Sequence, residues 1–251
     1  MDEKIIGTTM PVLELTLAPG EAIFAESGEL SWMTSSIRMT TSTQYGGGGG
    51  LDGVFKRAVG GGSLFMTEYA AQGAAGMVAF AAKLPGQIFP LDVRPEPGFQ
   101  FLGHRHAFVA GTHGVLVSVG FQQRLGAGVF GGDGFRLQKI AGQGRVWCEL
   151  SGEIVTYDLR AGEELKVHPG HVGLFQDTVQ FSITTVKGIK NKVFGGDGVF
   201  LAQLIGPGRV WLQSLPLARL AHALGEYTVV QGAEAGAAGG LVGGVLRNIG
   251  G

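Results

Sequence analysis

The chain has 251 residues, enough for one sizeable core or for several small modules in one unit. Lysine plus arginine (19) nearly balance aspartate plus glutamate (20), so the net charge of −1 and the lack of a basic cluster argue against nucleic-acid binding. The single cysteine, Cys148, excludes an intramolecular disulfide framework and a zinc site made of several cysteines.

The sequence predicts a cytoplasmic protein without a transmembrane segment. Residues 1–4 are mostly charged and no apolar signal core follows them, so secretion is not indicated. No stretch contains the about 18–20 apolar residues that cross a bilayer. The glycine-rich segment 232–251 predicts a loosely held tail, with peripheral contact to a partner or membrane as the alternative.

Short strands separated by glycine-rich turns dominate the chain. Alternating, β-branched or aromatic residues predict strands at 12–17, 37–40, 99–102, 115–119 and 179–183. Similar turn sequences end strands near Gly20, Gly86 and Gly162. The 46 glycines fit the tight turns of an all-β chain.

A glycine-aspartate block organises the sequence. It occurs at 129–134 and 193–198, each time followed by Gly-x-Gly-Arg-Val-Trp at 142–147 and 206–211, and a degenerate copy lies at 50–53. Apolar residues after each block recur at i, i+3 and i+4, which predicts a short helix capped by the aspartate and ended by a glycine. The spaced residues are Phe55/Ala58/Val59, Leu137/Ile140/Ala141 and Leu201/Leu204/Ile205. The alternative, a phosphate or metal loop, lacks the Gly-Lys-Ser/Thr ending of a P-loop.

These features predict an all-β fold in residues 1–225, built from three repeated β-sandwich-like modules in a pseudo-threefold arrangement. The modules span about 12–73, 78–152 and 154–215, and each carries one short helix. Hairpins are expected between 146–150 and 154–159 and between 64–70 and 77–84. The strand at 210–215 then lacks a hairpin partner, so we expect it to pair with 12–17 and close the modules into a ring.

A further helix is predicted at 216–225, before the tail. Pro216 suits its first turn, and Leu217, Leu220 and Leu224 lie with Ala221 on one face. The five glycines at 46–50 predict a flexible loop.

The histidines are the best candidates for a metal centre. His104 and His106 would lie on one face of a strand, and His113 could return nearby. Gly98 before His104 resembles the first half of the cupin metal motif, but no glutamate follows at the expected distance. No Gly-x-Ser-x-Gly nucleophile elbow is present. The sequence therefore assigns no catalytic, cofactor-binding or metal-binding residue, and no cofactor.

Two tryptophans and the cysteine are predicted to pack in the core. Trp147 and Trp211 occupy equivalent positions of the repeat, which favours packing over a ligand cage. Cys148 lies beside Trp147 in a strand and is expected to be an inert buried thiol.

The repeat resembles the family of bacterial, archaeal and mitochondrial proteins named for altered inheritance of mitochondria. The resemblance rests on the strand endings, on Ser-Leu-Phe-Met-Thr at 63–67, and on the Gly-x-Gly-Arg-Val-Trp motifs, and covers roughly residues 5–225. It implies modules like those of the tryptophan RNA-binding attenuation protein, together with self-association. It implies no catalytic residues, and likeness to an RNA-binding ring does not transfer its function.

The leading hypothesis is a non-enzymatic scaffold or binding protein that forms homo-oligomers, with a role at a membrane surface or in stress. The alternative is a cupin-like β-barrel enzyme that depends on a metal or small molecule and uses His104 and His106.

Overall fold

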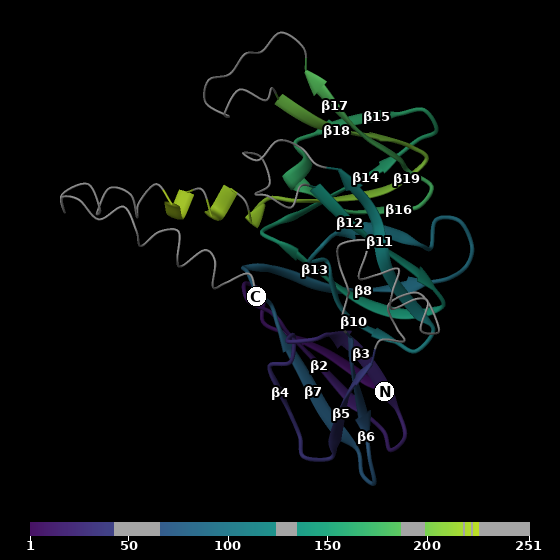
Figure 1. The fold of residues 1–251 in the computed structure, drawn as a ribbon, viewed down its shortest axis with the longest axis vertical. Coiled ribbons are helices and arrows are strands. Elements are labelled where there is room, and N and C mark those ends of the chain that lie inside the picture. Colours follow the sequence, from purple (N-terminus) through teal and green to yellow (C-terminus); the bar gives the residue numbers. More distant parts are fainter. Residues whose placement is uncertain (43–65, 124–134, 187–198, 218, 222, 226–251) are drawn as a thin grey trace, which may run out of the picture. The chain divides into compact units, whose positions relative to one another are not determined.

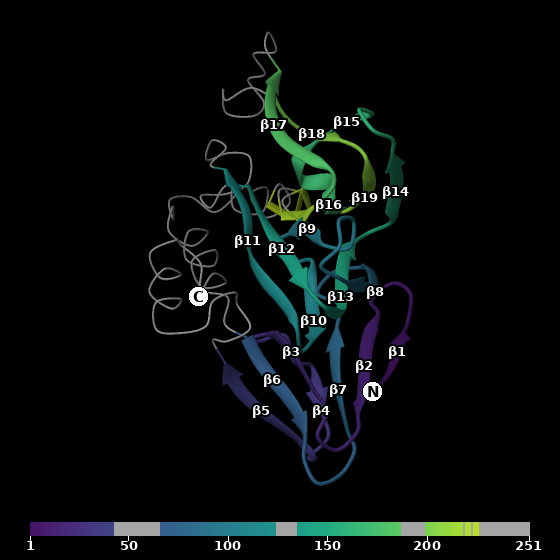
Figure 2. The same ribbon diagram turned by 90° about the vertical axis from the view of Figure 1, so that its right-hand side faces the viewer.

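The structure is a computed structural model that describes residues 1–42, 66–123, 135–186, 199–217, 219–221 and 223–225. The chain divides into two compact units, Met1–Pro216 and Leu217–Gly251. The first unit consists of antiparallel β-sheets (Figures 1 and 2). The all-β class is thus confirmed.

The described residues of the first unit form four sheets, here named A to D. Sheet A has the order β1 (Asp2–Ile6), β2 (Val12–Leu17), β7 (Gly76–Ala81), β4 (Trp32–Met33). Sheet B has the order β5 (Ile37–Ser42), β6 (Met66–Ala71), β3 (Ala22–Glu26), β10 (Phe108–Thr112), β13 (Gly144–Ser151), β8 (Gly86–Val93). Sheet C has the order β11 (Val115–Gln123), β12 (Phe135–Gly142), β9 (Phe101–His104), β16 (Val172–Gln176), β19 (Gly208–Gln213), β14 (Ile154–Leu159). Sheet D has the order β15 (Glu164–Val167), β18 (Val199–Ile205), β17 (Gln180–Val186), and the 3-10 turn η1 (Pro169–His171) precedes β16.

The strand pairings repeat three times, each time over six consecutive strands. In β2–β7, β8–β13 and β14–β19, the first strand pairs with the sixth and the sixth with the third. In the same sets the fourth strand pairs with the fifth and the fifth with the second. Each module therefore consists of two three-stranded half-sheets. Defined by these strand pairings, the modules span residues 12–81, 86–151 and 154–213. The strand at 76–81 therefore belongs to the first module and not, as predicted, to the second.

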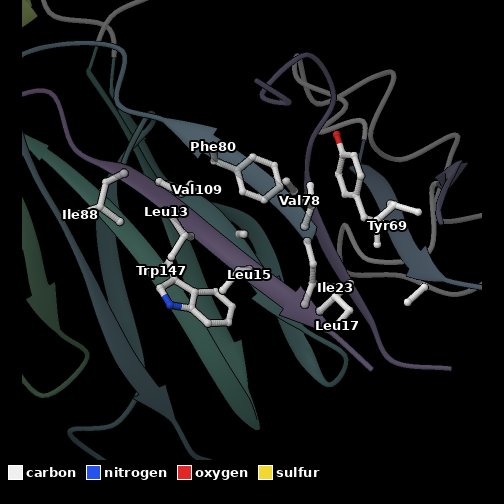
Figure 3. Close-up of a cluster of buried hydrophobic side chains, with 14 of the residues drawn as sticks. Leu13, Leu15, Leu17, Ile23, Tyr69, Val78, Phe80, Ile88, Val109 and Trp147 are labelled. Atoms are coloured by element: carbon white, nitrogen blue, oxygen red, sulfur yellow. The ribbon is translucent and has the colours of Figure 1, made fainter. Parts of the chain in front are cut away.

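In the part of the chain that the structure describes, three apolar cores lie between successive sheets. Side chains of sheets A and B form the first core, those of B and C the second, and those of C and D the third. In the first core, Leu13, Leu15 and Leu17 alternate along β2 and are fully buried, close to Trp147 of β13 (Figure 3). A period of two lays one face of a strand on the core, which is why this segment is a strand.

The helices predicted after the glycine-aspartate blocks are wrong where the structure describes them. Residues 135–142 form β12 and residues 199–205 form β18, while the first copy and the blocks themselves lie outside the described residues. Sheet C is covered on both faces: Leu137 points into the third core and Ile140 into the second. A strand buried on both faces can place apolar residues three apart, and this spacing imitates a helical stripe.

The two predicted hairpins and the ring closure are also wrong. β13 pairs in sheet B and β14 in sheet C, so Gly152 (φ +76°) leads the chain from one sheet to another; likewise β6 lies in sheet B and β7 in sheet A. The strands at 12–17 and 208–213 lie in different sheets, A and C. Turn residues that suit a hairpin suit a crossing between sheets equally well, because both need the same tight dihedrals.

The C-terminal helix is confirmed: residues 217, 219–221 and 223–225 are helical. Among the described residues, no helix combines the length and apolar character needed to cross a bilayer. The predicted loop at 46–50 and the tail at 232–251 lie outside the described residues.

Candidate functional site

Of the two candidate metal-binding histidines, His104 is the last residue of β9 and His106 lies in the turn that follows, so the prediction that both lie on one face of a strand is wrong. His104 Nδ1 accepts a hydrogen bond from the backbone N–H of His106 at 3.2 Å, and the two ring centroids are 6.2 Å apart. Arg105 donates from Nε to His106 Nε2 at 2.8 Å. His104 is half-buried, and its Nε2 is shielded from solvent without a hydrogen-bond partner in the described part of the chain.

Burial dominates the electrostatics of both rings. Loss of solvation lowers the pKa of His104 to about 3, and loss of solvation plus the charge of Arg105 lowers the pKa of His106 to about 4. Both imidazoles are therefore neutral at pH 7, with one lone pair each. These hydrogen bonds use the lone pair of His104 on a backbone N–H and that of His106 on Arg105, so neither ring offers a metal its free electron pair in this arrangement.

The same turn recurs in the third module. His168 Nδ1 accepts from the backbone N–H of Gly170 at 3.3 Å, and the ring centroids of His168 and His171 are 5.9 Å apart. Both turns join the second strand of a module to its third. A histidine at this position thus caps a turn of the repeat, which is a structural role independent of any ligand.

His113 is held elsewhere. It lies in the turn between β10 and β11, where its Nε2 is 3.3 Å from a carboxylate oxygen of Glu68 on β6. In the described part of the chain, no three His, Cys, Asp or Glu residues are grouped so that they could hold a metal ion.

A cluster of polar side chains lies where the first and second modules meet, and two of its members, Gln138 and Glu149, are buried. Gln138 on β12 donates to Glu26 on β3 at 2.6 Å. Glu149 on β13 accepts backbone N–H groups of Lys83 at 2.9 Å and Leu84 at 3.4 Å. We call Glu26, Gln138, Glu149 and Lys83, with Glu29, the first-junction cluster; Lys83 forms an ion pair with Glu29 at 2.7 Å.

The carboxylates of this cluster are poorly solvated. Burial is the largest influence on Glu26 and on Glu149, and it raises the pKa of each above its ordinary value. Sequence reasoning missed this cluster. The available signal was a charged residue at position 149 inside the otherwise apolar run Val146–Leu150, but its partners come from strands far away in the chain.

The arginine of the Gly-x-Gly-Arg-Val-Trp motif forms an ion pair across its sheet. Arg145 is 3.1 Å from Asp92, and Arg209 is 2.6 Å from Asp158. In both cases the aspartate lies directly opposite on the neighbouring strand. The motif is therefore explained by cross-strand pairing.

The tryptophan of the motif is buried, as predicted. Trp147 is fully buried and donates from Nε1 to Glu3 on β1 at 2.9 Å. Trp211 packs edge-on against Phe101, with 6.0 Å between ring centroids. Cys148 is fully buried, which confirms a packed residue, and burial raises the pKa of its thiol to about 12.

Taken with the fold, these contacts define a class of protein: an all-β protein of three tandem six-stranded modules joined through shared sheets. The family described as mitochondrial biogenesis AIM24 matches residues 4–215, and the chain belongs to this family.

Two relatives from Streptococcus pyogenes are similar over most of their length. An uncharacterized protein of serotype M6 is 27% identical over 221 residues, which cover 86% of each chain. A second protein of this species, known from an X-ray crystal structure, is 23% identical and has a TM-score of 0.70, with 90% of this chain and 99% of the other covered. The second likeness shows the fold alone.

Proposed function

We propose that this protein is a non-enzymatic, cytoplasmic scaffold that associates with itself and presents binding surfaces for partners. The observation that carries the proposal is the apolar character of the outer strands of sheet A. Large apolar side chains there are more than a third exposed: Ile5 and Ile6 on β1, and Trp32 and Met33 on β4. Exposed apolar side chains on unpaired edge strands form a template for association with another chain.

The roles of the singled-out polar residues support the same proposal. His104 and His168 cap turns, and Arg145 and Arg209 form cross-strand ion pairs. Each of these contacts is explained by the repeat, so none requires a substrate. The balanced charge of the chain likewise favours protein partners over nucleic acid.

The native mass of the purified full chain tests this proposal. Light scattering is expected to give a multiple of the 26.1 kDa protomer, and metal analysis is expected to give no stoichiometric metal. A monomeric mass together with one bound metal per chain, lost in a His104→Ala/His106→Ala variant, would overturn it in favour of the cupin-like enzyme.

Peripheral contact with membranes forms a separable part of the proposal, assigned to residues 232–251. Flotation of the full chain with anionic phospholipid vesicles, compared with a chain ending at residue 231, is the measurement. Loss of flotation on truncation supports the assignment, whereas equal flotation of the two forms removes the tail from it.

A further inference from the structure

Neighbouring modules are joined by one repeated contact between strands. The second strand of each module pairs antiparallel with the third strand of the next: β3 with β10, and β9 with β16. Each contact merges two half-sheets into one six-stranded sheet. Among the described strands, this rule leaves two without their counterpart: β4, the third strand of the first module, and β15, the second strand of the last.

A side-chain hydrogen bond fixes how the third strands correspond. At the end of each third strand, one residue uses a side-chain oxygen to accept a hydrogen bond from a backbone N–H on the sixth strand of the same module. The three bonds are Met77 to Thr34 at 2.9 Å, Arg145 to Thr112 at 2.9 Å, and Arg209 to Gln176 at 2.6 Å. Counting back from these residues, Met33 corresponds to Gly111 and Phe175, and Trp32 to Ala110 and Leu174.

The corresponding positions differ in burial according to whether a neighbouring strand is present. Ala110, Leu174 and Phe175, beside β3 or β9, are fully buried. Trp32 and Met33 on β4 are 46% and 37% exposed. The first module therefore leaves Trp32 and Met33 exposed at the positions that the other two modules bury beside a neighbouring strand.

The second strands correspond just as closely. The turn before β3 is closed by Glu21, which accepts the backbone N–H of Ala18 at 2.8 Å, and the turn before β15 by Glu163, which accepts that of Arg160 at 2.9 Å. Lys166 on β15 has a side chain that is 58% exposed. The outer edge of β15 thus has the position, direction and solvent access that its counterparts use to bind the next module.

We propose that β15 of one molecule pairs antiparallel with β4 of a second copy of this chain. The registers of the two internal contacts place Leu165 opposite Thr34, Lys166 opposite Met33 and Val167 opposite Trp32. The inference rests on the proposed self-association and specifies its surface. The contact is head-to-tail, so it generates rings or open filaments and not a closed twofold dimer.

The occupant is a second copy because the two edges are the halves of an interface that the chain already makes twice. Within one molecule they belong to sheets A and D, which share no core; sheets B and C and three cores intervene. The internal contacts also supply backbone hydrogen bonds that are independent of side-chain identity, so the same geometry serves a pair with a different sequence.

Disulfide trapping between two variants of the full chain, each with one introduced cysteine, tests the register. Met33→Cys and Lys166→Cys are purified separately, mixed and oxidised, and a disulfide-linked dimer of twice 26.1 kDa is expected in the mixture. Neither variant alone is expected to form this dimer. The native Cys148 is buried and does not interfere. Leu116→Cys on β11, 45% exposed, replaces Lys166→Cys in the matched control, where no dimer is expected with Met33→Cys.

The outcomes separate the inference from the proposed function. A multimeric native mass without the mixed disulfide overturns the strand pairing and leaves self-association standing. A monomeric mass overturns both. A Met33→Cys/Lys166→Cys double variant that forms only an intramolecular disulfide overturns the choice of a second copy, because the edges then meet within one molecule.

Discussion

The two junctions between modules are formed by the same type of strand pairing, but their polar side chains differ in charge. At the first junction, Glu149 and Gln138 are buried, and Gln138 donates to the half-buried Glu26. At the second, the amide of Gln213 accepts the backbone N–H of Ser151 at 3.2 Å and donates to the carbonyl of Gly170 at 3.1 Å. The second junction is satisfied by a neutral group, whereas the first carries carboxylates with raised pKa. The buried carboxyl of the first junction is thus expected to respond to pH, whereas the amide side chain of the second is not.

The apolar packing beside the first junction is expected to contribute more to stability than the polar contacts of either junction. Phe108 is fully buried and stacks on Phe24, with 5.4 Å between ring centroids. Phe108→Ala is expected to lower the free energy of unfolding by about 3–5 kcal/mol. Urea denaturation measures the change, with Leu116→Ala, on an exposed strand position, as the matched control that should change stability by less than about 0.5 kcal/mol. Equal effects of the two substitutions would contradict the assignment of Phe108 to the core.

At the second junction, loss of the neutral amide leaves buried backbone groups unsatisfied. Gln213→Ala is expected to lower the free energy of unfolding by about 1–3 kcal/mol, because the N–H of Ser151 and the carbonyl of Gly170 lose their partner. The loss should be the same at pH 5 and pH 8. Gln143→Ala, at an exposed turn, is the control. If the free energy of unfolding that Gln213→Ala loses varies with pH, the contrast between the two junctions is wrong.

The first junction is expected to show the opposite behaviour. A carboxyl whose folded-state pKa is raised above 4.5 contributes stability that is present below pH 4.5 and is lost as pH rises through the folded-state value. Glu149→Gln keeps an oxygen for the N–H of Lys83 and removes the charge. The variant should gain about 1 kcal/mol relative to wild type between pH 4 and pH 7. Glu153→Gln, at an exposed position, serves as the control. The prediction is refuted if the free energy of unfolding changes with pH in the same way for Glu149→Gln and for wild type.

The smallest expected effect concerns β4 and β15, the two strands that lack a neighbouring module among the described strands. Directly opposite cross-strand residues share one face, so a charge at position 33 meets Lys166 in the proposed contact. Met33→Lys should weaken self-association about fivefold relative to Met33→Glu, which corresponds to about 1 kcal/mol. Sedimentation equilibrium measures both variants. Lys166→Glu should reverse the order, and an unchanged order would exclude this pairing.

Local sequence was enough to predict most strands but not their partners. The alternation of Leu13, Leu15 and Leu17 predicted β2, and the repeated motifs predicted like modules. Residues 135–142 resemble a helix in sequence because sheet C packs on both faces, so the period of two is hidden. Along 200–204 the sequence carries both patterns, since Phe200, Ala202 and Leu204 alternate as in a strand while the apolar residues also recur at helical spacing.

The candidate site was likewise predictable from the sequence only in part. The spacing of His104 and His106 predicted two imidazoles on one face of a strand, but β9 ends at His104, so only their proximity holds. The sequence also could not show that a backbone N–H and Arg105 take their lone pairs. The first-junction cluster could not be predicted, because Glu26 and Gln138 are 112 positions apart and meet only when two modules share a sheet.

The sequence by itself determined the all-β class, the threefold repeat of its motifs, the buried tryptophans and cysteine, and membership of the family. Burial of alternate residues and turn dihedrals depend on near neighbours, so they can be read locally. The tertiary structure alone decided which strands pair, because any glycine turn permits either a hairpin or a crossing to another sheet. Choosing between them depends on which apolar faces meet across the molecule, and that choice also decided which edges remain open.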